Sequence, residues 1–119
     1  MPHLTLEYTS NLTQFDAAGA LLHLNRILAG SGQFKSELDI KSRAIRLDTF
    51  RIGTAPEERA FIAVKLVMLS GRTEQTKREM SEMLLAALQE IDTGAAKCHL
   101  QLSVEVLDLG VYSKSLHTL

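Results

Sequence analysis

The sequence predicts an α/β protein of the α+β kind, built from two successive strand–helix–strand units. Segments in which apolar and polar residues alternate predict strands, and apolar residues at helical spacing predict one helix inside each unit. The second unit repeats the order of the first after roughly 60 residues, which indicates an internal duplication. We therefore expect a single domain over residues 1–119, with halves at about 1–53 and 58–108 and a C-terminal tail.

The first half begins with a strand at residues 2–8, where every second side chain is apolar. Thr13, followed three residues later by Asp16, resembles a capping box at the start of a helix. The apolar residues of that helix recur at helical spacing: Phe15, Ala18, Leu21, Leu22, Leu24 and Leu28. Gly30 and Gly32 then end the helix, and residues 40–47 form the second predicted strand.

The second half begins after a predicted loop at residues 53–58. Residues 60–69 are almost continuously apolar, as in a strand that is buried on both faces. Thr73 is placed to cap the next helix, whose apolar stripe is Met80, Met83, Leu84, Ala87, Leu88 and Ile91. Alternation at residues 100–106 predicts the last strand, and the tail at 110–119 has no strong pattern.

Composition excludes several classes of protein. The formal net charge of -1 provides no basic field for nucleic acid or an anionic membrane. With Cys98 as the only cysteine, no disulfide can form within the chain, as is usual in a reducing compartment. The N-terminus has no signal-peptide pattern, and the longest apolar run is far too short to span a bilayer. We expect a cytoplasmic protein.

The order of elements leaves two architectures open. A ferredoxin-like sandwich has the same order along the chain. A pair of βαβ units, each with a right-handed crossover between parallel strands, has it too. Periodicity alone does not separate them.

Several short motifs carry a resemblance to a known family. They are Met1-Pro2-His3, Ile40-Lys41-Ser42-Arg43, Asp48-Thr49, Gly71-Arg72 and Ser81-Glu82-Met83-Leu84. Together, over roughly residues 2–106, the chain resembles the 5-carboxymethyl-2-hydroxymuconate isomerase family of the tautomerase superfamily. The resemblance implies duplicated βαβ units in a four-stranded mixed sheet with two helices on one face, and a homotrimer.

The resemblance also implies an activity. The family interconverts keto and enol forms of unsaturated 2-hydroxy di- or tricarboxylates, such as 5-carboxymethyl-2-hydroxymuconate, in aromatic acid catabolism. It implies an active site around Pro2, with Lys41, Arg43 and Arg72 as substrate-binding residues and with neither metal nor organic cofactor. The family has arginine at both strand positions, so Lys41 departs from its pattern and leaves the substrate open.

Pro2 has the chemistry that a general base needs once Met1 is removed. An N-terminal proline nitrogen is a secondary amine, and burial and nearby cations lower the pKa of such an amine toward neutrality. A base works best when it titrates near the working pH. Small second residues such as proline favour removal of the initiator methionine, so we expect processing. The alternative is that Pro2 only starts an edge strand, where its missing N–H does no harm.

Lys41 and Arg43 are two residues apart on a predicted strand, so both side chains face the same side, about 6.6 Å apart along the strand. Two cations on one strand face favour an anionic ligand, with a solvated face or intersubunit ion pairs as the alternative. Arg72 lies at a strand-to-helix turn, a common place for anion binding, with an ordinary surface arginine as the alternative.

Two other functions remain open from the sequence. A superfamily dehalogenase or hydratase would use the same proline in its protonated form, as an acid. A non-catalytic trimeric binding module would result if Met1 were retained, because the nitrogen of Pro2 would then be an amide.

Overall fold

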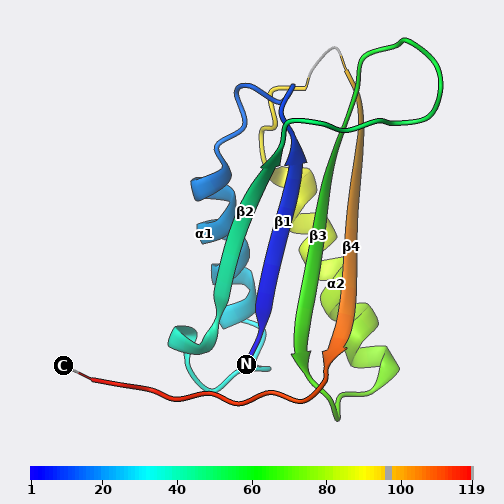
Figure 1. Cartoon of the computed structure of the whole chain (residues 1–119). Coiled ribbons are helices and arrows are strands. Elements are labelled where there is room, and N and C mark those ends of the chain that lie inside the picture. Colours follow the sequence, from blue (N-terminus) through cyan, green and yellow to red (C-terminus); the bar gives the residue numbers. More distant parts are fainter. Residues whose placement is uncertain (96–97, 119) are drawn as a thin grey trace.

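A computed structural model describes residues 1–95 and 98–118 of the chain, so Leu119 at the end of the predicted tail lies outside the described residues. The first half contains β1 (His3–Thr9), α1 (Ala17–Ala29), the short 3₁₀ helix η1 (Glu37–Asp39) and β2 (Lys41–Leu47). The second half contains β3 (Arg59–Leu69), α2 (Glu74–Glu90) and β4 (His99–Leu109). The four strands form one sheet, and both helices lie on the same face of it (Figure 1).

The strand order, β2-β1-β3-β4, decides between the two predicted architectures. Each strand pairs in parallel with the strand that its own helix leads to, β1 with β2 and β3 with β4. The two units join through antiparallel pairing of β1 with β3. A ferredoxin-like sandwich splits each βαβ unit. The paired βαβ arrangement is therefore confirmed, and the ferredoxin-like alternative is wrong.

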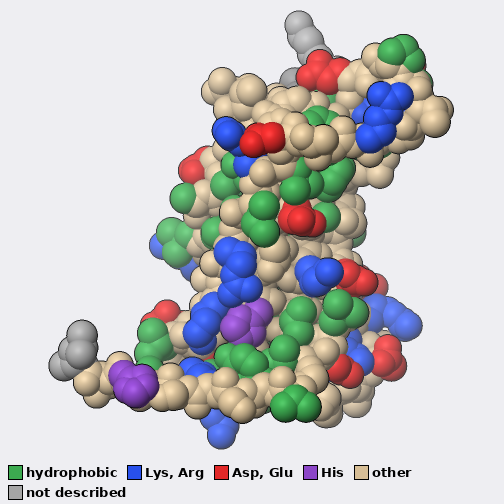
Figure 2. Space-filling view, in the orientation of Figure 1, with side chains coloured by type: hydrophobic (Ala, Val, Ile, Leu, Met, Phe, Trp, Pro, Cys, Tyr) green, Lys and Arg blue, Asp and Glu red, His purple; other side chains and the backbone are tan. Residues whose placement is uncertain are grey.

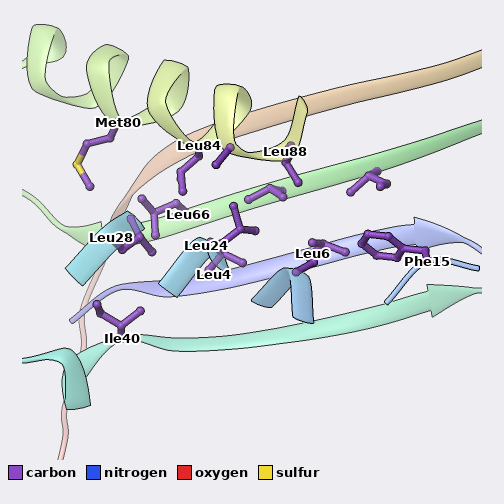
Figure 3. Close-up of a cluster of buried hydrophobic side chains, with 14 of the residues drawn as sticks. Leu4, Leu6, Phe15, Leu24, Leu28, Ile40, Leu66, Met80, Leu84 and Leu88 are labelled. Carbon is purple, nitrogen blue, oxygen red and sulfur yellow. The ribbon is translucent and has the colours of Figure 1, made fainter. Parts of the chain in front are cut away.

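The core fills the space between the helices and the covered face of the sheet (Figure 3). Leu4 and Leu6 of β1 and Leu66 of β3 are fully buried there, against Leu24 of α1 and Leu84 of α2. Burying each leucine side chain contributes about 1.5–3 kcal/mol. The predicted alternation of β1 and the apolar stripe of α2 thus form most of this layer.

The long apolar strand is not buried on both faces as the sequence predicted. Along β3, buried and more accessible residues alternate, so that Ala60, Ile62 and Leu66 are buried while Lys65 and Leu69 are exposed. The reason is that both helices lie on one side of the sheet, which leaves its other face open in the chain. The apolar residues on that open face therefore need another explanation than the core.

Helix α1 starts differently from the prediction. Its N-cap is Asp16, whose carboxylate accepts a hydrogen bond from the Gly19 N–H at 3.0 Å, and Thr13 lies exposed before the helix. The predicted capping box is therefore wrong. Leu22, placed in the apolar stripe, is 52% exposed. Thr73 caps α2 as predicted, accepting from the Thr76 N–H.

Four segments of the chain meet at one end of the sheet. The antiparallel register puts Val67, near the end of β3, beside His3 at the start of β1, and the parallel register puts Lys41 on its other side. The tail at 110–118 leaves β4 at this end and runs along it past the N-terminus (Figure 1). In the described parts of the chain, the helices are too short or too polar to cross a membrane.

Candidate active site

Pro2 lies directly before β1 and is almost completely buried. Its carbonyl accepts a hydrogen bond from the backbone N–H of Lys41 at 3.2 Å, which fixes the start of β1 against the start of β2. Met1 is half-buried in front of it. The strand pairing therefore holds the first residues of the chain in a covered position at the end of the sheet.

Charged groups surround the amino terminus. The pKa of the Met1 amine is lowered from its usual value chiefly by burial. Asp39 opposes this effect, and the positive charges of Arg72, Lys114 and Lys41 add to it. The sequence predicted Lys41, Arg43 or Arg72 near Pro2; of these, Lys41 and Arg72 act on the amine of Met1, and Arg43 is not among the charges that do.

Lys41 and Arg43 share the open face of the sheet with the residues of β1 beside them. The register pairs Lys41 with His3 and Arg43 with Thr5. The Lys41 ammonium donates to the Asp39 carbonyl at 3.3 Å and is one of the charges acting on the amine. Figure 2 shows Lys and Arg side chains gathered around a histidine on this face.

Arg43 contacts His3. Its Nη2 donates to His3 Nδ1 at 3.3 Å, and His3 Nε2 lies 3.1 Å from the Tyr112 hydroxyl. Since a guanidinium can only donate, Nδ1 must be unprotonated, so Nε2 carries the hydrogen of the neutral ring and donates it to Tyr112. The pKa of His3 is lowered by burial and then by Arg43 and Lys41, which also favours the neutral form.

Arg72 is anchored by protein acceptors. Its Nη2 and Nε donate to the carbonyl and the side-chain oxygen of Gln33 at 2.7 and 3.2 Å, and Nη1 donates to the Leu69 carbonyl at 3.1 Å. The guanidinium also lies over the Phe34 ring, 5.1 Å from its centroid. These contacts tie the turn before α2 to the loop after α1, and they occupy donors that a ligand would need.

Lys114 is a cation at this end of the sheet that the sequence did not predict. Its ammonium lies 3.1 Å from the Asp39 carboxylate and 3.6 Å from the sulfur of Met1. The tail has no periodicity, so no local pattern distinguishes this lysine from a solvated one. Only the path of the tail across the end of the sheet places it beside the N-terminus.

In the described residues, no three His, Cys, Asp or Glu side chains lie together in a way that could hold a metal ion. The groups that do gather at this end of the sheet are an amine, a neutral imidazole and several cations. Such a set can bind an anion and move a proton.

Comparisons with known proteins bear on the family and the fold of the chain. The family model described as 5-carboxymethyl-2-hydroxymuconate isomerase matches residues 2–115. A solved structure of a 5-carboxymethyl-2-hydroxymuconate isomerase from Deinococcus radiodurans is 33% identical over 97% of this chain and 90% of that chain, with a TM-score of 0.85. No curated protein sequence matches the chain.

Two more distant structures share the fold. A 5-carboxymethyl-2-hydroxymuconate delta-isomerase is 18% identical over 98% of this chain and 89% of that chain, with a TM-score of 0.82. A fused 4-OT symmetric trimer is 12% identical over 90% of this chain and 86% of that chain, with a TM-score of 0.61. At these identities the likeness shows the fold alone.

Proposed function

The chain belongs to the 5-carboxymethyl-2-hydroxymuconate isomerase family and is an isomerase, and from that premise we propose its substrate and mechanism. The substrate is an unsaturated 2-hydroxy di- or tricarboxylate such as 5-carboxymethyl-2-hydroxymuconate, formed in the cytoplasmic catabolism of aromatic acids. The isomerase interconverts its enol and keto forms. Pro2 acts as base and then as acid.

The mechanism begins with removal of Met1, which converts the amide nitrogen of Pro2 into a secondary amine. The neutral amine takes the proton of the enol hydroxyl and becomes an ammonium. The electrons of the O–H bond form the carbonyl, the double bonds shift, and the ammonium returns a proton to a carbon of the conjugated system. The enzyme thus ends in the state in which it began.

The observation that carries this proposal is the environment of the first residues. Pro2 is almost completely buried. The pKa of the Met1 amine next to it is lowered, chiefly by burial and then by the charges of Arg72, Lys114 and Lys41, against Asp39, which raises it. Burial and these cations favour a neutral amine at Pro2 as well. A hydratase or dehalogenase would instead need Pro2 protonated, so the same observation favours the tautomerase.

The cations have a second role in the proposed reaction. Deprotonating the enol gives an anionic dienolate whose charge spreads over the conjugated system and its carboxylates. Positive groups that are fixed in advance stabilise such developing charge and give a large part of the rate enhancement. Lys41 and Arg43, on the open face of the sheet beside His3, are proposed to bind the carboxylates.

We also propose that the active form is a homotrimer. The open face of the sheet carries exposed apolar side chains, among them Ile45 at 44% and Leu107 at 39%. A hollow of about 350 Å³ lies on the same face, with Thr5, Lys65 and Glu105 in its lining. Packing this face against other copies would remove apolar area from water, which stabilises assembly.

The test of the proposed function joins two measurements on one sample. Intact mass establishes that Met1 is absent, and the ultraviolet absorbance of a 2-hydroxymuconate then follows ketonisation. We expect Pro2→Ala to lower kcat by about 100-fold or more, because proton transfer by a positioned group contributes on that order. Processed protein without activity, or a Pro2→Ala variant as active as the parent, would overturn the mechanism.

A further inference from the structure

The C-terminal tail is tied at two points to the end of the sheet where β1 and β2 begin. The Tyr112 hydroxyl accepts from His3 at 3.1 Å, and Lys114 pairs with Asp39 at 3.1 Å. These contacts join residues that are 109 and 75 positions apart in the sequence. The tail thus crosses the end of the sheet at which the N-terminus lies (Figure 1).

Lys114 is held in a defined place there. Its side chain is 28% exposed and that of Asp39 is 30% exposed, so the pair is largely covered. An ammonium has three N–H donors. Asp39 takes one of them, and the contact with the sulfur of Met1 ends when Met1 is removed. Once Met1 is removed, two N–H donors of Lys114 would therefore be left without these partners, at the end of the sheet where the chain begins.

The other cations at this end are engaged to different degrees. Arg72 uses three donors on Gln33 and Leu69, and Arg43 donates to His3. Lys41 has a single acceptor, the Asp39 carbonyl, but lacks the planar fork of an arginine. A substrate with two or three carboxylates can contact several cations at once, and Lys114 is one of those that keep free donors.

We propose that Lys114 is a substrate-binding residue that contacts one carboxylate of the substrate, with Asp39 as its counter-ion in the empty enzyme. The proposal rests on the function proposed above. The tail then takes part in substrate recognition, because it carries Lys114 and because the contact of Tyr112 with His3 holds the tail in place. Asp39 competes with the substrate for Lys114 and therefore weakens binding.

The experiment measures binding without catalysis. The probe is muconate, which has two carboxylates but lacks the enol hydroxyl and so cannot tautomerise. Isothermal titration calorimetry on protein without Met1 gives its Kd for the parent and for Lys114→Gln and Lys114→Arg. The matched control is Arg46→Gln, which removes a cation from an exposed ion pair of the same 3.1 Å length near the far end of β2.

We expect Lys114→Gln to weaken muconate binding about ten-fold, the effect of losing one charged hydrogen bond. Lys114→Arg keeps most of the affinity, and Arg46→Gln leaves the Kd unchanged. Asp39→Asn breaks the same ion pair but keeps Lys114, so muconate should bind at least as tightly. This opposite response of the two partners separates a ligand-binding role from a structural one.

Equal Kd values for the parent and Lys114→Gln would overturn the proposal, as would Asp39→Asn weakening binding as much as Lys114→Gln does. No binding of muconate to the parent at millimolar concentration would overturn it as well. Failure of the proposed function would give a different result. The parent without Met1 would bind muconate through Lys114 but would not ketonise a 2-hydroxymuconate. The role of Lys114 in binding would then stand, and the proposed reaction would not.

Discussion

At the scale of single residues, the amino terminus combines opposing charge effects. Burial and the charges of Arg72, Lys114 and Lys41 lower the pKa of the Met1 amine, while Asp39 raises it. The proposed removal of Met1 would move the amine one position along the chain, to the buried Pro2. Asp39 therefore has two expected effects on the enzyme: it neutralises Lys114, and it holds the amine nearer to its usual basicity.

The pH dependence of the reaction should report these charges. The base must be neutral, so kcat/KM falls as the pH drops through the pKa of the amine. Asp39→Asn removes the group that raises this pKa and should move the acid limb of kcat/KM to lower pH. Lys41→Gln removes a group that lowers it and should move the limb to higher pH.

The control for this prediction is Asp48→Asn, which removes an exposed carboxylate beyond the far end of β2. It should leave the acid limb where it is. Shifts of Asp39→Asn and Lys41→Gln in the same direction would contradict the assignment of the limb to an amine between these two charges.

At the scale of elements, the start of α1 depends on a contact that the sequence pattern did not indicate. Asp16 caps the helix through the N–H of Gly19. A Cβ at Gly19 would collide with the Asp16 carboxylate. Glycine is therefore needed here to leave space for the capping side chain, and its backbone conformation is an ordinary one. The helix in turn supplies Leu24 and Leu28 to the core beneath β1.

Two matched substitutions test this cap. Asp16→Ala removes the acceptor for an otherwise unpaired helical N–H and should lower the free energy of unfolding by about 1 kcal/mol. Thr13→Ala changes an exposed residue outside the helix and should have little effect. Denaturant titration of both variants measures the difference. If Thr13→Ala lowered the free energy of unfolding more than Asp16→Ala does, the result would support the capping box that the sequence predicted.

At the scale of the whole molecule, the sheet has one covered and one open face. Both helices pack on the first, while the second carries Ile45 and Leu107 together with the Lys65–Glu105 ion pair. The apolar run of β3 predicts a strand that is buried on both faces. In the proposed trimer, other copies would cover the open face and so bury the second side of β3. A test of assembly is therefore also a test of whether the open face of β3 becomes buried.

Leu107→Lys tests the proposed homotrimer. A charge on the open face has to be buried without a partner in the assembly, at a cost of several kcal/mol. We expect sedimentation to change from trimer to monomer. Leu22→Lys places the same charge at an exposed position of α1 on the other side of the sheet and should leave the trimer intact. A parent that sediments as a monomer at micromolar concentration would refute the assembly.

The sequence by itself determined the elements of the fold and suggested the N-terminus as the site. Alternation in β1 and the stripe of α2 depend on neighbouring residues, so these elements could be predicted from their own segments. The shared face of Lys41 and Arg43 followed from strand geometry alone. The proposal that Pro2 is the base came from its position in the sequence and from the family resemblance.

Only the tertiary structure decided which groups meet. The pairing of β1 with β3, the contact of Arg43 with His3 and the place of Lys114 beside Asp39 each join residues far apart in the sequence. Such contacts depend on how the elements pack and on the path of the tail, and no local periodicity encodes them. For the same reason, the open face of β3 could not be distinguished from a buried one by its apolar residues.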